Sequence, residues 1–338
     1  MFMVNLNLIS SHTLDSKENT DFMKQFLISI IRISIITIFA SLLLIIVVFW
    51  GIRSIYDNNY QKGFVYQYRA LQNSPLDQNK VIVIGGSYMT FAVDSSELSK
   101  KLDMPVYTLG IHSGMGMEYI LETAKKFVNE GDTIVFSFIP YEANQYGMDL
   151  IYLSLDGETD MFLDFLKNHP TEVIKSIGAA TITKLYGIKD YIKRHNSEAT
   201  SVYDARSFDK NSGNLIYKRD KRKATIEYLS KFKGDENIED MDKECFYEVL
   251  ELSNYCNHNN IEFDIIYAPF CHGYYDFESK DEASEYQKQL EEAMNCNFMV
   301  DIAECELPVD YIYDEILHAN DLGKEYYTNL IYEGLREY

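Results

Sequence analysis

The sequence predicts an α/β domain built on a parallel β-sheet and preceded by one transmembrane helix. Short apolar runs alternate with amphipathic stretches of helical spacing, which is the pattern of a sheet covered by helices on both faces. A single long apolar segment lies near the N-terminus. The composition fits a folded chain, because 46% of the 338 residues are hydrophobic and 25% are charged.

The apolar segment runs from Ile33 to Trp50 and contains no charged residue. At 1.5 Å per residue it nearly covers a hydrocarbon core of roughly 30 Å, and extension back to Phe26 completes the span. We expect a short cytoplasmic tail over residues 1–25, a transmembrane helix over 26–52 and a connector over 53–79. The alternative is a cleaved signal peptide, whose apolar region is normally about 7–15 residues long.

The charges that flank this segment set its expected orientation. Lys17, Lys24 and Arg32 precede the segment, while Arg53 and Lys62 follow it. This slight excess of basic residues on the N-terminal side favours a cytoplasmic N-terminus. The sequence therefore predicts a single-pass protein of the cell membrane whose main domain is extracytoplasmic.

Five parallel strands are expected in the main domain, which spans residues 80–338. The apolar runs that predict them are 81–84, 106–111, 133–139, 262–268 and 298–302. Helices expected between and after the strands cover 95–102, 118–129, 241–258, 281–295 and 321–336. These spacings suit right-handed parallel crossovers.

Residues 148–233 break the alternation and predict a helical insertion. Helix-like stretches cover 161–167, 171–177, 181–193 and 222–232, around a polar loop over 196–214. The basic run from Lys218 to Lys223 is typical of a solvated helix start.

The net charge of −21 argues against nucleic acid as a partner, because the surface repels phosphate backbones. Five cysteines lie in the last third of the chain, and an odd number cannot pair completely within it. Their spacing matches no zinc-binding pattern, so we interpret them as buried thiols and expect no metal.

The first candidate site residue follows the first strand, in Gly85-Gly86-Ser87. Ligands of open α/β sheets bind beyond the carboxyl ends of the strands, and the glycines permit a tight turn that exposes the hydroxyl. Taken alone, the pattern is equally typical of a plain capped turn. A nucleotide-binding site is the other alternative, but IGGSYMT matches neither the G-x-G-x-x-G pattern nor a Walker loop with its lysine.

A carboxylate and an imidazole share the segment before the last expected helix. A serine hydroxyl needs a base that accepts its proton, and the base works best when a carboxylate orients it. Asp314 and His318 supply these groups in the chain order Ser, Asp, His. Glu315 is the alternative acid, and a lone histidine hydrogen-bonded to the backbone is the plainer interpretation of His318.

Taken together, these segments resemble the SGNH (GDSL-like) hydrolase superfamily. The likeness is carried by Ile84-Gly85-Gly86-Ser87, by Thr108-Leu109-Gly110, by the strand ending Phe138-Ile139-Pro140-Tyr141-Glu142, and by Asp314 to Gly323. It is greatest for the membrane-anchored branch that includes the teichoic-acid D-alanylation protein DltD and the extracellular partners of membrane-bound O-acyltransferases.

The resemblance implies a three-layer fold with a five-stranded parallel sheet and a mechanism that passes through an acyl-serine. It implies no metal or organic cofactor. Its oxyanion hole would combine the serine N–H, a glycine N–H and an asparagine side chain. Ser87, Gly110, Asp314 and His318 match by position, whereas the family's Gly-x-Asn after the third strand is absent, so Asn144 is the nearest candidate for the third donor.

The expected function is that of a membrane-anchored serine esterase or O-acyltransferase that acts on an extracellular glycan or cell-envelope polymer through an acyl-Ser87 intermediate. A membrane-bound O-acyltransferase is the expected protein partner. The alternative is a catalytically weak SGNH-like module that binds a polysaccharide or such an acyltransferase without turnover.

Overall fold

The structure is a computed structural model of the whole chain. It describes residues 6–47, 59–141, 146–176, 178, 181, 199, 201–234 and 237–336. The chain divides into two compact units, Met1–Arg53 and Ser54–Tyr338.

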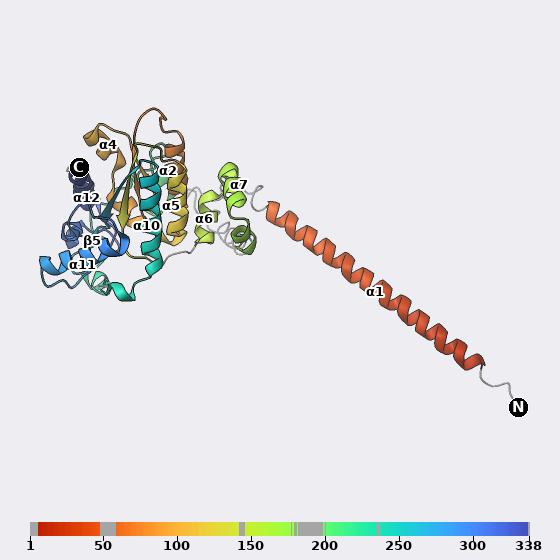
Figure 1. Cartoon of the computed structure of the whole chain (residues 1–338). Coiled ribbons are helices and arrows are strands. Elements are labelled where there is room, and N and C mark those ends of the chain that lie inside the picture. Colours follow the sequence, from red (N-terminus) through yellow and green to blue (C-terminus); the bar gives the residue numbers. More distant parts are fainter. Residues whose placement is uncertain are drawn as a thin grey trace. The chain divides into compact units, whose positions relative to one another are not determined.

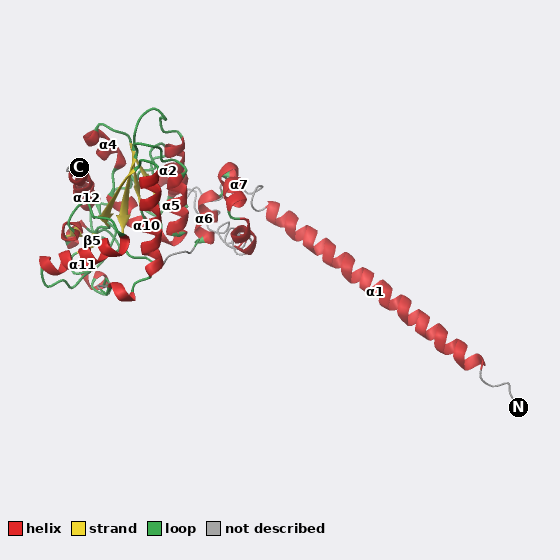
Figure 2. Ribbon diagram, viewed as in Figure 1, coloured by secondary structure: helices red, strands yellow, loops and turns green. Residues whose placement is uncertain are grey.

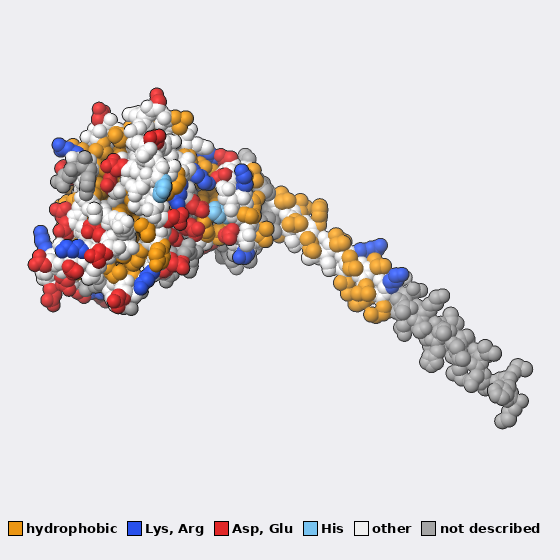
Figure 3. All heavy atoms as spheres, in the orientation of Figure 1, with side chains coloured by type: hydrophobic (Ala, Val, Ile, Leu, Met, Phe, Trp, Pro, Cys, Tyr) orange, Lys and Arg blue, Asp and Glu red, His pale blue; other side chains and the backbone are white. Residues whose placement is uncertain are grey.

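The first unit is one long helix, α1 (Leu6–Ile46). Its stretch from Phe22 to Leu44 has a mean hydropathy of 2.4, and apolar side chains cover it in Figure 3. By length and composition this stretch suits either a membrane span or a signal sequence. The helix begins much earlier than expected, because most of the predicted tail is helical. Residues 48–52 of the predicted span lie outside the described residues.

The second unit is an α/β domain around a parallel sheet of four strands. The strands are β1 (Val81–Ile84), β2 (Val106–Leu109), β3 (Thr133–Phe138) and β4 (Glu262–Tyr267), in the order β2-β1-β3-β4. Every residue of β1 and β3 is buried, as is usual for central strands that helices cover on both faces. The predicted α/β class and its parallel sheet are confirmed (Figure 2).

The expected fifth strand is reduced to one parallel bridge between Phe298 and Ile265. Met299 N–H donates to the Ile265 carbonyl, after which the chain turns away. Asp301 accepts a hydrogen bond from Ala303 N–H and so starts the 3-10 helix η5 (Ile302–Cys305). A separate parallel pair joins β5 (Phe270–Cys271) to β6 (Glu306–Leu307). The five-strand prediction is therefore too high by one strand for this sheet in the described residues.

Helices cover both faces of the sheet (Figure 1). On one side lie α2 (Lys62–Gln72), α5 (Met117–Lys125) and α10 (Lys243–His258), and on the other lie α4 (Ser95–Leu102) and α12 (Asp321–Arg336). The remaining helices of the sheet region are α3 (Ser87–Ala92) and α11 (Lys280–Met294). Helix α2 lies inside the predicted connector, where it packs Phe64 against Tyr119 of α5 at a ring separation of 5.3 Å.

The insertion has the helices expected over 161–167 and 171–177, since its described residues 159–168 and 170–176 are helical. It contains α6 (Met148–Leu155), α7 (Thr159–Asn168), the 3-10 helix η3 (Ala205–Ser207) and the single turn α9 (Ile226–Leu229). The helix expected over 222–232 is confined to that turn, because Lys223 N–H and Ala224 N–H donate to the Tyr313 carbonyl instead of to a helix. Most of the helix expected over 181–193 lies outside the described residues.

All five cysteines are free thiols. Cys245, Cys256, Cys271 and Cys305 are buried, and Cys296 is partly exposed. Burial raises the pKa of each thiol, for example to about 11 at Cys245 and about 12 at Cys256, so these thiols stay protonated at neutral pH.

A buried ion pair lies at the amino ends of the strands, opposite the end of the sheet that carries Ser87. Lys80, just before β1, places its Nζ 2.6 Å from Asp132 Oδ2, and both side chains are nearly fully buried. Asp132 also accepts hydrogen bonds from the backbone N–H groups of Lys80 and Asn129. The pair therefore fixes the start of β1 against the start of β3.

Asp132→Asn should lower the free energy of unfolding of this unit by about 3–5 kcal/mol, because it leaves the Lys80 ammonium buried without a carboxylate. Denaturant unfolding followed by circular dichroism measures the change. Glu97→Gln is the matched control, since it breaks the exposed Glu97–Lys100 pair and should cost less than about 1 kcal/mol. Equal losses in the two variants would contradict the importance of the buried pair.

Asp264 of β4 gives the fold a pH dependence. Burial, helped by the charge of Glu262, raises the pKa of its carboxyl to about 6. Since the folded state holds this proton more tightly than the unfolded state, stability falls as the pH rises from about 4 through 6. Asp264→Asn should therefore unfold at a higher temperature than the parent above pH 6, with the difference shrinking toward pH 4. A difference that does not vary with pH would refute the assignment.

Candidate active site

Ser87 lies where β1 passes into α3. The chain leaves Ile84, turns at Gly85 and Gly86, and starts the helix at Ser87. A side chain on Gly86 would overlap the Ser113 hydroxyl and the Tyr88 ring, so a larger residue at this turn requires both side chains to move. Ser87 is partly exposed whereas its flanking residues Gly86 and Tyr88 are buried, and its hydroxyl is therefore the accessible polar group of this turn.

The segment before α12 forms a closed loop that carries Asp314 and His318. Ile312 and Ala319 form an antiparallel bridge, and Tyr313 N–H donates to the His318 carbonyl at 2.7 Å. At its exit, Asn320 accepts hydrogen bonds from the first N–H groups of α12 and donates to the Asp310 carbonyl. Both ends of the loop are thus held by backbone hydrogen bonds, which restricts the position of the imidazole.

The structure brings the three predicted acid–base residues together. His318 Nε2 lies 3.0 Å from Ser87 Oγ, and His318 Nδ1 lies 3.0 Å from Asp314 Oδ1. The imidazole is 4% exposed. This is the order of contacts in which a base accepts the serine proton while a carboxylate orients the base.

Of the two candidate acids, Asp314 has the position of the orienting group. Glu315 Oε2 lies 3.8 Å from Nε2, on the side of the ring that faces Ser87, and its side chain is 56% exposed. His112 is another histidine near the site. Burial, and next the charge of His318, lower the pKa of His112. Its Nδ1 accepts a hydrogen bond from Gly114 N–H at 2.9 Å.

Two aromatic residues of the site were missed by the sequence reasoning. Phe91 of α3 stacks on the His318 ring, with centroids 4.0 Å apart and planes 12° apart. Tyr203 of the insertion places its hydroxyl 3.0 Å from Asp314 Oδ2 and 3.4 Å from His318 Nδ1. Nothing in the sequence places Tyr203 at the site, since it lies 111 residues from Asp314. Phe91 could have been predicted, because it lies one helical turn after Ser87.

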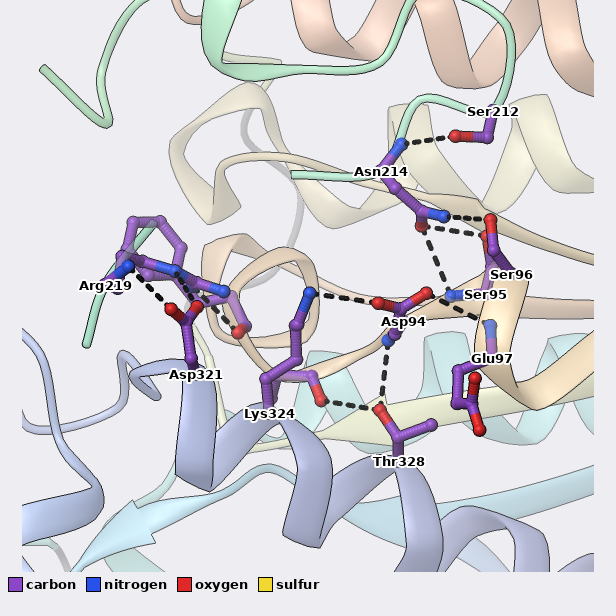
Figure 4. Close-up of polar contacts among 12 residues, drawn as sticks. Asp94, Ser95, Ser96, Glu97, Ser212, Asn214, Arg219, Asp321, Lys324 and Thr328 are labelled. Atoms are coloured by element: carbon purple, nitrogen blue, oxygen red, sulfur yellow. Dashed lines mark hydrogen bonds and ion pairs between the residues drawn. The ribbon is translucent and has the colours of Figure 1, made fainter. Parts of the chain in front are cut away.

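A buried guanidinium lies behind the imidazole. Arg219 is 1% exposed and lies over the Phe91 ring, with its Cζ 5.0 Å from the ring centroid. Its Nη1 donates to the carbonyls of Phe91 and Ala319, and its Nε lies 3.6 Å from Asp321 Oδ1 (Figure 4). Burial lowers the pKa of Arg219, and the Asp321 carboxylate opposes that effect.

The segment that carries Arg219 is tied to the sheet domain by further polar contacts (Figure 4). Asn214 accepts hydrogen bonds from Ser95 and donates to Ser96 Oγ at 2.8 Å, at the start of α4. Asp94 caps α4 and pairs with Lys324 of α12 at 3.0 Å. These contacts hold the insertion, α4 and α12 in one arrangement around the site.

Of the two oxyanion donors predicted besides the serine N–H, the structure describes only Gly110. Gly110 N–H donates to Gln67 Oε1 at 2.9 Å and is therefore already engaged. Asn144 lies outside the described residues. Ser113 contributes a hydroxyl that lies against Gly86, next to the serine, and sequence reasoning did not single it out.

Among the described residues, no group of three or more His, Cys, Asp or Glu side chains is arranged to hold a metal ion. A scan against protein-family models, a search of curated proteins and a search of solved structures each returned no match.

Gly110→Ala should prevent the turn after β2 from forming. Gly110 has φ +128°, and a methyl group there would overlap the Gly85 carbonyl oxygen, immediately before the Gly86-Ser87 turn. We expect a loss of more than about 3 kcal/mol in the free energy of unfolding, measured by chemical denaturation. Gly273→Ala is the control: its φ is +79° but no atom lies within 4 Å, so it should cost about 1 kcal/mol. Equal costs would contradict the steric argument.

Proposed function

We propose that this chain is a membrane-anchored serine esterase or O-acyltransferase of the SGNH type, acting on an extracellular glycan or cell-envelope polymer. The observation that carries the proposal is the continuous contact from Ser87 through His318 to Asp314, at 3.0 Å for each step. The order of the sheet, with the serine after its first strand and the acid–base loop before its last helix, supports the same assignment.

In the proposed reaction Ser87 Oγ attacks the ester carbonyl while its proton passes to His318 Nε2. The Asp314 carboxylate stabilises the resulting imidazolium. The tetrahedral intermediate collapses as the imidazolium returns the proton to the leaving alcohol, which leaves an acyl-Ser87 ester. Water or a sugar hydroxyl then attacks this ester, with His318 again accepting the proton, and Ser87 is regenerated.

The membrane location belongs to the same proposal. A helix with the length and hydropathy of Phe22–Leu44 would anchor the domain, with the N-terminus cytoplasmic and the domain outside. Anchoring raises the effective concentration of the site near membrane-bound acyl donors and lipid-linked polymers. A membrane-bound O-acyltransferase is therefore the proposed partner.

One observation favours the second candidate function, a weakly catalytic binding module. Gly110 N–H is occupied by Gln67, so this donor can serve an oxyanion only if that hydrogen bond opens. The loss of one such donor typically lowers turnover by about 10²–10³-fold. The same module could still bind a polysaccharide or an acyltransferase.

A fluorophosphonate probe tests the enzyme proposal on the full chain in detergent. The probe should label the wild-type protein, and Ser87→Ala should abolish labelling because it removes the nucleophile. His318→Ala should slow labelling by about 10³-fold or more, since the serine loses its base. The measurement is the rate of probe incorporation.

Ser230→Ala is the matched control, because Ser230 is exposed and its hydroxyl bonds the Glu227 carbonyl of its own turn. It should label at the wild-type rate. Labelling that persists in Ser87→Ala would refute the acyl-serine mechanism, and labelling lost equally in Ser230→Ala would show that the assay reports on folding.

A further inference from the structure

Tyr203 comes from the insertion and contacts both Asp314 and His318. The donors and acceptors around these two residues determine which of them accepts the Tyr203 proton. When Ser87 Oγ–H donates to Nε2, the neutral imidazole carries its single proton on Nδ1. That proton is donated to Asp314 Oδ1. Nδ1 therefore has no lone pair for the Tyr203 proton, which goes to Asp314 Oδ2 at 3.0 Å.

The two oxygens of Asp314 thus have different donors. Oδ1 accepts from the imidazole and Oδ2 accepts from the phenol, so the plane of the carboxylate is fixed by both. Burial and the charge of Asp314 raise the pKa of Tyr203, which keeps the phenol protonated and able to donate. The 3.4 Å contact between its oxygen and Nδ1 adds a second, longer interaction with the imidazole N–H.

The phenol is held in place before any substrate binds. Val202 and Ala205, on either side of Tyr203, are each 1% exposed. Ser207 Oγ donates to the Ser201 carbonyl at 2.7 Å and closes the turn. The Tyr203 ring packs against Tyr60 at 5.4 Å and Phe91 at 6.1 Å, and the side chain is nevertheless 38% exposed at the surface of the site.

We propose that Tyr203 is a positioning residue of the site, which orients the Asp314 carboxylate toward the His318 imidazole. This inference rests on the proposed acyl-serine function and extends it, since it makes the insertion a structural part of the acid–base machinery. The site is incomplete without the 201–207 segment, because Tyr203 is the donor to Asp314 Oδ2 among the described residues.

Tyr203→Phe tests the proposal, because it keeps the ring and removes only the hydroxyl. Hydrolysis of a simple aryl acetate by the full chain in nanodiscs should lose about 10- to 100-fold in kcat, because the Asp314 carboxylate is no longer held in one plane against the imidazole. KM should stay within about twofold, since the hydroxyl acts on the orientation of Asp314. The melting temperature should fall by no more than about 5 °C, as for the loss of one hydrogen bond.

The pH profile separates positioning from packing. The phenol hydrogen bond draws charge away from the Asp314 carboxylate, so its removal leaves more negative charge facing the imidazole. The acidic limb of the kcat profile should therefore move to higher pH in Tyr203→Phe. A packing defect would lower kcat at every pH and leave the limb in place.

Tyr228→Phe is the matched control: Tyr228 lies in the same insertion, is 40% exposed and contacts Phe232 edge to face. It should match the wild type in kcat and in pH profile. A second readout needs no turnover: the proton resonance of the His318 Nδ1–H, recorded by NMR, should shift in Tyr203→Phe and not in Tyr228→Phe.

The outcomes separate the two proposals. If Ser87→Ala retains probe labelling, the acyl-serine function fails, and the NMR shift still decides the role of Tyr203. If labelling depends on Ser87 but Tyr203→Phe matches Tyr228→Phe in kcat, pH limb and NMR, the role proposed for Tyr203 is overturned alone.

Discussion

One buried cation joins the two chain segments on which the site depends. Arg219 donates through a single nitrogen to the carbonyl of Phe91, near the end of the helix that starts at Ser87, and to that of Ala319, beside His318. Burying a guanidinium disfavours its charge, and here the two carbonyls and the Asp321 carboxylate offset part of that cost, while Nε and Nη2 have no hydrogen-bond partner among the described residues. Because both carbonyls bond the same group, the C-terminal end of α3 and the residue after His318 are held together.

These contacts make the insertion part of the structure that supports the site. Arg219 and Tyr203 both come from it, and they reach the acid–base pair from different directions: the guanidinium through the backbone of the loop, the phenol through the Asp314 carboxylate. The sheet positions Ser87 by local geometry, since the residue follows β1 directly. His318 lies 231 residues away and needs contacts from outside the sheet to hold it within hydrogen-bond distance. The insertion supplies them.

Elements that depend on local chemistry could be predicted from the sequence, whereas those that depend on contacts between distant segments could not. Apolar runs such as 81–84 must be buried on both faces, so the four strands and the position of Ser87 could be predicted. The segment 298–302 is also mostly apolar, but it contains Asp301, which turns the chain after one bridge, and the apolar pattern alone does not show which of the two effects prevails. Tyr203 and Arg219 carry no motif. Their roles arise only when loops separated by about a hundred residues meet.

The hydrogen bond from Gly110 N–H to Gln67 stabilises the fold but occupies a donor that could otherwise bind an oxyanion. Its positive φ lets the end of β2 approach the Gly85 carbonyl closely, and its N–H then meets Gln67 of α2, a buried amide that would itself need a partner. A free oxyanion donor at this position would leave that amide oxygen without its hydrogen bond, at the cost of an unsatisfied buried polar group. The acid–base half of the site is thus built from contacts that leave Ser87 accessible, whereas the glycine that could stabilise an oxyanion is committed to packing. Catalysis at Ser87 would depend most on the donors near the turn itself, its own N–H and the Ser113 hydroxyl that lies against Gly86.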